Sequence, residues 1–236
     1  WPEYEWLRNA VPYFDDERVA AVGGPAVTPA ADSRRQQVSG MIYSSMFVSG
    51  STTYRYIFRA FREVDDYPTC NLLVRRSDFE AVGAFDTDYW PGEDTVLCLK
   101  LVHQLGKKLL YVPNVPVYHH RRPVYLPHLK QVYSYAVHRG FFTRKFPQTS
   151  RKFQFFVPSI FVVALVLGFL SGLFIPLVMY CYLSVLALYA LLLVIASVKS
   201  LDVLTNLLVL PGIFLTHLTY GMGFIRGLFS RRMKEQ

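Results

Sequence analysis

Two adjacent carboxylates, Glu93 and Asp94, stand at the start of the segment GEDTVLCLKLVHQLG. Leu97, Leu101 and Leu105 follow at every fourth residue, which is the spacing of the buried face of an amphipathic helix. Asp94 therefore falls in the first turn, where unpaired backbone N–H groups and the helix dipole favour an ionised carboxylate. A carboxylate held in this way can accept a proton near neutral pH, as a general base does. The same pattern is also typical of an acid that only caps a helix.

The elements on either side of this helix end in polar or charged residues. Upstream, the apolar run at residues 70–74 predicts a strand, followed by a short helix with a capping box of Ser77 and Glu80 that ends at Gly83. Downstream, KKLLYVPNVPVYHHRRP predicts extended chain that ends in the basic cluster at residues 119–122. Since ligands of α/β proteins bind where such elements end, this order favours a binding site here.

The order of these motifs resembles the C-terminal half of the family 2 glycosyltransferases, which are membrane-attached inverting enzymes of the GT-A fold. The motifs are NLLVRR, FEAVGAFD, GEDTVLCLKL, GKKLLYVP, VYHHRRP and LKQVYSYAVHRG, and the resemblance covers residues 1–150. It implies an α/β fold class, namely a partial GT-A (Rossmann-like) catalytic domain followed by an α-helical transmembrane region. Ala84 departs from the Gly-Gly-Phe turn that is usual in the family.

The resemblance also implies roles for individual residues. Asp94 would deprotonate the acceptor hydroxyl, and Glu93 would help to position the acceptor. His119 or His120 would lie near the metal and the diphosphate, and the choice between them is open. The residues expected to bind the substrates are Asn71, Arg75, Arg76, Trp90, Arg121, Arg122, Gln131 and Arg139. Of the adjacent arginines after the histidines, one would neutralise the leaving nucleotide.

A divalent metal, Mg²⁺ or Mn²⁺, is implied as well, held on the donor diphosphate by an Asp-x-Asp element. The only such spacing in the sequence is Asp86-Thr87-Asp88, which lies in the loop before Gly92, whereas the family's element precedes a segment like WPEYEWLRNAVPYF. We therefore expect the element to lie upstream of Trp1. On this interpretation the chain starts inside the catalytic domain, and this part of the domain is inactive by itself.

The sequence becomes strongly apolar from residue 153 onward. Residues 153–172 and 177–198 each supply about 20 residues without a charge, enough to cross a hydrocarbon core of roughly 30 Å. Pro176 leaves only a few residues between them, so we predict a tight helical hairpin. A chain that is 52% hydrophobic and 18% charged, with its apolar residues at one end, is typical of an integral membrane protein.

A third apolar segment, residues 203–225, is interrupted by Pro211-Gly212 and followed by a basic tail. Basic residues at 144–152 place the catalytic part on the cytoplasmic side, and the tail favours the same side. A re-entrant or interfacial segment broken at Pro211-Gly212 satisfies both basic clusters, whereas a full span satisfies only the first. The expected parts are the C-terminal part of the catalytic domain (1–126), an amphipathic interfacial helix or linker (127–152) and the membrane region (153–236).

The net charge of +8 does not indicate nucleic acid, because the basic residues flank apolar spans or adjoin the HHRRP turn. The three cysteines have no metal-ligand or disulfide spacing. The expected function is transfer of a sugar, with inversion, from a nucleotide-sugar donor to a membrane-associated acceptor. That acceptor would be a lipid-linked saccharide or polysaccharide precursor, as in cell-envelope polysaccharide biosynthesis. The alternative is a non-catalytic, membrane-attached interaction module.

Overall fold

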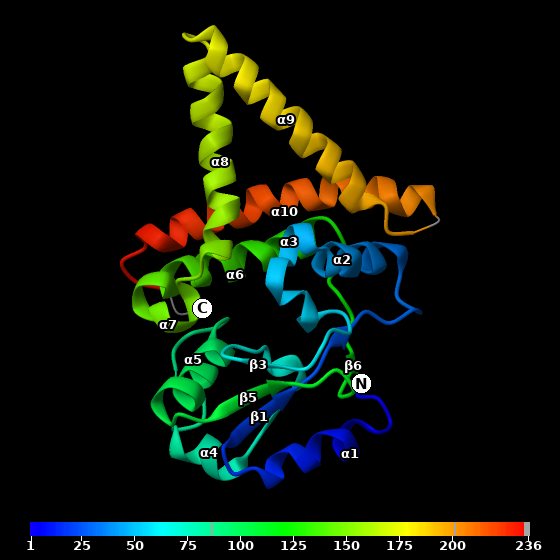
Figure 1. The fold of residues 1–236 in the computed structure, drawn as a ribbon, viewed down its shortest axis with the longest axis vertical. Helices are drawn as coiled ribbons and strands as arrows, with labels where there is room; N and C mark the ends of the chain where they lie inside the picture. The colour runs from blue at the N-terminus through cyan, green and yellow to red at the C-terminus, as the bar shows by residue number, and fades with distance from the viewer. Residues whose placement is uncertain (86, 201, 234–236) are drawn as a thin grey trace.

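The computed structural model describes residues 1–85, 87–200 and 202–233. These residues form an α/β part, from which two long helices project as a hairpin (Figure 1). The α/β part contains a four-stranded sheet in the order β3-β5-β1-β4 and a separate two-stranded sheet of β2 and β6. This mixed α/β arrangement followed by long apolar helices agrees with the predicted fold class.

The central strand of the larger sheet is β1 (Val19–Gly23), and all of its residues are buried. A continuous apolar run of this kind is typical of a strand covered on both faces. β1 pairs in parallel with β5 (Lys108–Tyr111) and antiparallel with β4 (Leu72–Val74), and β3 (Arg62–Val64) is antiparallel to β5. The smaller sheet pairs β2 (Ala26–Val27) with β6 (Val117–Tyr118) in parallel.

Helix α5 (Glu93–Leu99), which carries the two adjacent carboxylates, continues into a π-helical turn at Lys100–Gln104. Leu97 and Leu101 are at most 1% exposed and belong to the same core as residues of β1 and β5, as their spacing predicted. Burying each of these leucines contributes about 1.5–3 kcal/mol. The first turn of α5 is therefore fixed on the sheet by the apolar residues that follow it.

The short helix before it, α4 (Arg76–Ala81), starts two residues earlier than the sequence pattern indicated. The predicted capping box of Ser77 and Glu80 is therefore wrong. Arg75 is the N-cap, because its backbone is still extended and its N–H donates to the Ala20 carbonyl of β1 at 2.8 Å. Glu80 pairs instead with Arg76 one turn away, at 2.7 Å. The predicted end of α4 is confirmed, since Gly83 has a φ of 79°.

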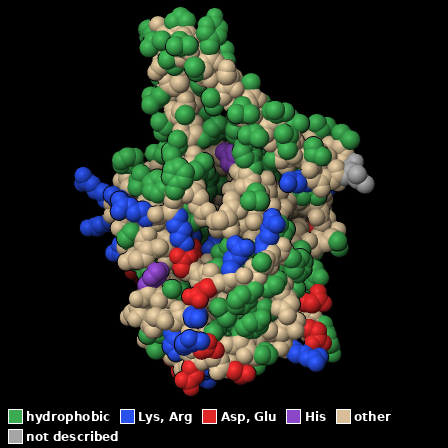
Figure 2. All heavy atoms as spheres, in the orientation of Figure 1, with side chains coloured by type: hydrophobic (Ala, Val, Ile, Leu, Met, Phe, Trp, Pro, Cys, Tyr) green, Lys and Arg blue, Asp and Glu red, His purple; other side chains and the backbone are tan. Residues whose placement is uncertain are grey.

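The predicted hairpin is formed by α8 (Phe153–Gly172) and α9 (Pro176–Ser197). Its surface is covered by hydrophobic side chains, and Lys and Arg gather in a band just below it (Figure 2). Within the described residues, α8, α9 and α10 (Val203–Phe229) are long and apolar enough to cross a membrane, by length and composition. The hairpin has little buried surface of its own, which is typical of helices that face lipid.

The expected break at Pro211-Gly212 is wrong, because α10 is one helix of 27 residues with Pro211 inside it. Neighbouring elements support the turn that the proline weakens. The Tyr125 hydroxyl donates to the Leu208 carbonyl at 2.9 Å, and a side chain on Gly212 would meet Ile42 at 2.4 Å. α10 lies across the base of the hairpin, beside α6, instead of running parallel to α8 and α9 (Figure 1).

The predicted amphipathic helix between the catalytic part and the hairpin is α6 (Leu126–Lys145), followed by the single turn α7 (Pro147–Ser150). Its apolar face is buried against α10 and is not free to enter lipid. Glycines allow the two backbones to touch. A Cβ on Gly140 would lie 2.1 Å from the Phe224 carbonyl oxygen, and one on Gly227 would lie 1.9 Å from that of Val137.

The same long helix α10 also contacts α2 (Arg34–Ser44) and α3 (Met46–Ser49). His217 of α10 donates to the Phe47 carbonyl at 2.9 Å, and the buried His128 of α6 bonds both Ser39 and Thr216, at 2.8 and 3.0 Å. The α2–α3 segment is thus tied to the membrane region. The remaining helical elements are α1 (Trp6–Ala10) and the 3₁₀ turns Val11–Asp15, Gly50–Arg55 and Thr69–Asn71.

Candidate active site

The candidate site is centred on the first turn of α5. Gly92 precedes the helix with a φ of 128°, and a Cβ at this position would lie 2.7 Å from the Phe142 ring of α6. Only glycine combines that backbone conformation with so close an approach. Glu93 and Asp94 therefore begin the helix directly under α6, and the predicted place of Asp94 in the first turn is confirmed.

Thr95 links Asp94 to a second carboxylate, Asp66, which comes shortly after β3 in the chain. Its backbone N–H donates to Asp94 Oδ1 at 2.7 Å, and its hydroxyl donates to Asp66 Oδ1 at 3.2 Å. Asp66 is only 3% exposed. Two arginines compensate its charge: the Arg139 guanidinium lies 2.8 Å from Asp66 Oδ2, and that of Arg55 lies 3.4 Å from the same oxygen.

The two carboxylates consequently have opposite electrostatic environments. Burial alone would raise the pKa of Asp66, but Arg139 and Arg55 outweigh it and hold that pKa well below its usual range. For Asp94, burial together with the negative charges of Asp66 and Glu93 raises the pKa to about 6. Among the described residues, the only hydrogen bond to the Asp94 carboxylate comes from the Thr95 backbone.

Arg139 also joins the site to the membrane region. It donates to the Ser150 hydroxyl of α7 at 3.1 Å, and its guanidinium lies 4.8 Å from the centre of the Phe155 ring at the start of α8. Gln131, about two turns earlier on α6, donates weakly to the Tyr135 hydroxyl at 3.5 Å. Burial raises the pKa of Tyr135, and the charge of Asp94 adds to the shift.

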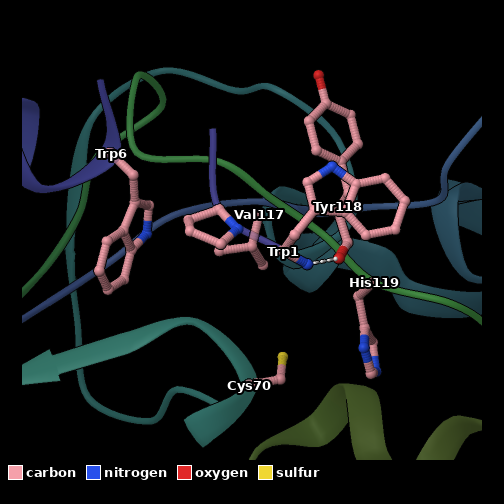
Figure 3. Close-up of a pocket in the computed structure, with 7 residues that line it drawn as sticks. Trp1, Trp6, Cys70, Val117, Tyr118 and His119 are labelled. Atoms are coloured by element: carbon pink, nitrogen blue, oxygen red, sulfur yellow. Dashed lines mark hydrogen bonds between the residues drawn. The ribbon is translucent and has the colours of Figure 1, made fainter. Parts of the chain in front are cut away.

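A second part of the candidate site is a pocket of about 260 Å³ near the start of β6 (Figure 3). His119 and Cys70 line it together with aromatic and apolar side chains from Trp1, Pro2, Trp6, Val117 and Tyr118. The pKa of Cys70 is raised by burial, and Asp94 is among the charges that act on it.

Asn71 lies behind that pocket, with its side chain fully engaged. Its amide donates to the carbonyls of Gly24 and Val115 at 2.6 and 2.8 Å, and its oxygen accepts from the Trp6 indole at 2.9 Å. It thus holds the chain around Gly24, where a Cβ would lie 1.9 Å from the Val115 carbonyl oxygen. In this position Asn71 shapes the pocket through the backbone.

The four basic residues after β6 are divided between different surroundings. His120 is exposed and its Nδ1 bonds Asp32, whereas His119 faces the pocket. Arg121 is buried: it donates to the Ala26 carbonyl and the Thr28 hydroxyl, and it stacks 5.2 Å from the Tyr56 ring centre. Arg122 is exposed and lines a different pocket, at the start of α6.

Other predicted substrate-binding residues lie apart from Asp94. Arg75 donates to the carbonyls of Phe14, Asp16 and Val19, so it braces the amino end of β1. Arg76 is exposed and pairs with Glu80 on the same helix. Trp90 is 70% exposed in the loop that leads into α5. The structure brings together Asp94, Glu93 and Arg139, and places Arg75 and Arg76 at the opposite end of β1.

The described residues do not form a metal site by themselves. No group of three or more His, Cys, Asp or Glu side chains in this part of the chain is arranged to hold an ion. Of the two candidate histidines, His119 has the better position, because the His120 imidazole is already tied to Asp32. The Asp-x-Asp spacing at residues 86–88 includes Asp86, which lies outside the described residues.

Asp66, Arg55 and Thr95 also belong to the site, although they were not predicted from the sequence. Asp65-Asp66 directly precedes the segment YPTCNLLV, so a carboxylate pair ahead of a strand was the available signal. The Lys152 ammonium lies 2.6 Å from Asp65 Oδ1, so Asp65 has its own ion pair and Asp66 is the carboxylate of the candidate site. The residues next to Arg55 in the sequence do not indicate that it belongs to the site. Its partner Asp66 comes close to it only through the turn between the 3₁₀ segment and β3.

The fold and the site together define a partial GT-A domain joined to a helical membrane region. Comparison with protein families agrees: a family model described as glycosyl transferase family group 2 matches residues 3–198. The chain belongs to this family, and the match extends through the hairpin. Neither the curated proteins nor the solved structures gave a significant match to the chain.

Proposed function

We propose that the protein transfers a sugar from a nucleotide-sugar donor to a membrane-associated acceptor, with inversion, and that Asp94 is the general base. The observation that carries this proposal is the electrostatic contrast between Asp94 and Asp66. Neighbouring carboxylates whose pKa values are pushed in opposite directions are typical of acid–base sites. Asp94 is the member of the pair that lacks a cation of its own within the described residues.

The reaction then follows from the position of that carboxylate. The acceptor hydroxyl oxygen attacks the anomeric carbon of the donor from the face opposite the diphosphate. As the new C–O bond forms, Asp94 takes the hydroxyl proton, and the bond between the anomeric carbon and the phosphate oxygen breaks. The nucleoside diphosphate leaves with the bonding electron pair, so the configuration at the anomeric carbon inverts.

Asp94 suits the role better than either neighbour. The Asp66 oxygens accept from Arg139 and Thr95, and a base with so low a pKa takes up a proton poorly at neutral pH. Glu93 turns back to accept from its own helix start, with the Gly92 N–H 2.9 Å from Oε2. We assign Glu93 to positioning the acceptor and Asp66 to holding Arg139 and Thr95.

The substrates occupy the two sides of Asp94 in this proposal. The donor lies on the side of the aromatic pocket with His119, where flat ring faces suit a base or a sugar. The acceptor comes from the membrane side, because α6 lies over the site and packs on α10 at the base of the hairpin. A lipid-linked saccharide or a growing polysaccharide precursor fits this approach.

A divalent metal on the donor diphosphate remains part of the proposal, since the family implies it. When bound, a metal of this kind offsets the charge of the leaving diphosphate. His119 is the described residue placed to contribute one ligand. The other ligands would come from outside the described residues.

Substitution of Asp94 by Asn tests the proposal, because the amide keeps the shape but cannot accept a proton. In the complete protein, reconstituted in membranes and assayed with a panel of nucleotide sugars, we expect Asp94→Asn to lower kcat by about 10²–10⁴. Donor binding, measured by calorimetry, should stay close to wild type. Asp15→Asn is the matched control, an exposed acid at the end of a 3₁₀ turn. Wild-type turnover in Asp94→Asn would show that Asp94 is only a cap.

We further propose that the catalytic part faces the cytoplasm. Lys and Arg flank the start of α8, whereas the turn between α8 and α9 carries none. In a background without Cys70 and Cys181, an impermeant thiol reagent applied to intact cells should label Phe174→Cys and spare Lys145→Cys. Efficient labelling at position 145 from outside would reverse the orientation.

A further inference from the structure

A pocket of about 310 Å³ lies at the start of α6, outside the candidate active site. It is lined by two basic residues, Arg122 and Lys130, and by two apolar ones, Leu126 and Pro127. Lys130 is one turn after Leu126 on α6, so both belong to the same exposed side of the helix. Leu126 is 63% exposed, which leaves an apolar side chain next to two cations.

Neither cation of this pocket has a counter-ion in the described part of the chain. Arg122 and Lys130 make no side-chain hydrogen bond and no ion pair there, whereas three neighbouring basic residues do. Arg121 is bonded to Thr28, Arg34 pairs with Asp202 at 3.4 Å, and the exposed His120 takes up Asp32. Asp202 and Asp32 are thus engaged by other basic residues, and the pocket keeps its positive charge.

The pocket also lies at the level where the chain meets the membrane region. Tyr125, directly before α6, donates its hydroxyl to the Leu208 carbonyl of α10 at 2.9 Å. α10 crosses the base of the hairpin, and Lys and Arg form a band just below the hydrophobic hairpin surface (Figures 1 and 2). If α8 and α9 cross the bilayer, the start of α6 is at headgroup depth.

We propose that this pocket binds the phosphate of an anionic membrane lipid. Arg122 and Lys130 hold the phosphate, and Leu126 and Pro127 contact the glycerol and the first methylene groups of the acyl chains. The lipid is a bilayer component and is neither donor nor acceptor, so this inference goes beyond the proposed function and does not rest on it. Its binding fixes the start of α6, and with it the helix that lies over Asp94.

A lipid fits the pocket better than a free phosphate, because half of the lining residues are apolar. A soluble anion would gain nothing from Leu126, whereas an acyl chain covers it. The positive charges of Arg122 and Lys130 would attract a lipid phosphate and a free phosphate alike. The experiment must therefore separate a lipid from a soluble phosphate, and a site from the general positive charge of the surface.

The test uses the complete protein in detergent, with native mass spectrometry to count bound lipid. Phosphatidylglycerol is added in one series and phosphatidylcholine in another. We expect wild type to retain phosphatidylglycerol and not phosphatidylcholine. Since a Lys or Arg near an anionic lipid surface contributes about fivefold to binding, Arg122→Gln/Lys130→Gln should weaken retention roughly 25-fold.

The matched control is Lys145→Gln/Arg151→Gln, which removes the same charge from two exposed residues, one at the other end of α6 and one after α7. Its lipid retention should equal that of wild type. Equal losses in both double variants would mean that general surface charge holds the lipid, and would overturn the site. A second series adds inorganic phosphate: displacement of phosphatidylglycerol at millimolar phosphate would identify a soluble-anion site and overturn the lipid assignment. Leu126→Ala should weaken lipid retention without changing the charge. Unchanged retention would show that the lipid does not contact Leu126 and would contradict this part of the proposal.

Discussion

Two regions of the α/β part each contain a buried arginine–aspartate pair, and only one of them has features of an active site. At the amino end of β1, Arg75 lies 3.6 Å from Asp78 and donates to backbone carbonyls. Under α6, Arg139 lies 2.8 Å from Asp66. The residue types are the same in the two regions, but the Arg75 and Asp78 side chains are 25% and 11% exposed, against 16% and 5% for Arg139 and Asp66.

The difference is the carboxylate next to the second pair. Asp94 is linked to Asp66 through Thr95 but receives no cation of its own from the described residues. Burial and the adjacent negative charges raise its pKa to about 6. A carboxylate left in such surroundings costs stability, so its presence points to a chemical role. In the proposed mechanism, the paired Asp66 has a structural role and Asp94, which has no ion pair within the described residues, is the base.

The largest effect on stability should come from removing the charge of Asp66. Asp66→Asn leaves Arg139 and Arg55 buried without their carboxylate, and breaking a buried pair in this way costs about 3–5 kcal/mol. At the other pair, Asp78→Asn breaks only longer contacts, to Arg75 at 3.6 Å and Lys107 at 3.7 Å, and we expect about 1 kcal/mol or less.

Thermal unfolding of both variants in the same detergent, followed by intrinsic fluorescence, measures this difference. Equal midpoints for Asp66→Asn and Asp78→Asn would contradict it, since the two pairs would then be equivalent. Arg139→Lys adds a second check, because Lys keeps the charge but cannot bond Asp66 and Ser150 with a planar fork. We expect its midpoint to lie between those of wild type and Asp66→Asn.

A smaller effect is expected for Glu93→Gln. An acid in the first turn of a helix contributes about 0.3–1 kcal/mol, and the Gln side chain keeps the size of the group that accepts from Gly92. Because the Glu93 charge helps to raise the pKa of Asp94, its removal should lower that pKa. The acid limb of the activity profile should then move to lower pH. An unchanged limb would mean that Glu93 does not act on the base.

The local features of the site could be predicted from the sequence. The spacing of Leu97 and Leu101 fixed where α5 packs, and this placed Asp94 in the first turn. The hairpin could be predicted equally well, because two uncharged runs of about 20 residues with a proline between them allow few other structures. Both inferences depend only on residues close together in the chain.

The features that depend on distant contacts were not predicted. Asp66 and Arg139 are 73 positions apart, and no local pattern brings them together. The continuity of α10 through Pro211 was missed for the same reason. The local signal favoured a break, but packing against α2, α6 and α8 keeps the helix intact. The sequence also did not predict that Arg121 is buried while Arg122 is exposed. This difference depends on the pairing of β6 with β2, which are distant in the chain.

The pH dependence of kcat/KM in the complete protein tests the central claim most directly. A general base must be unprotonated, and a raised pKa means that the proton returns at a higher pH than for an ordinary aspartate. We therefore predict that activity is full above pH 7 and falls tenfold per pH unit below an apparent pKa of about 6. Asp66→Asn should shift this limb to lower pH, because it removes one of the charges that raise the pKa of Asp94. A wild-type profile that stays flat down to pH 5 would contradict the assignment of Asp94 as the base.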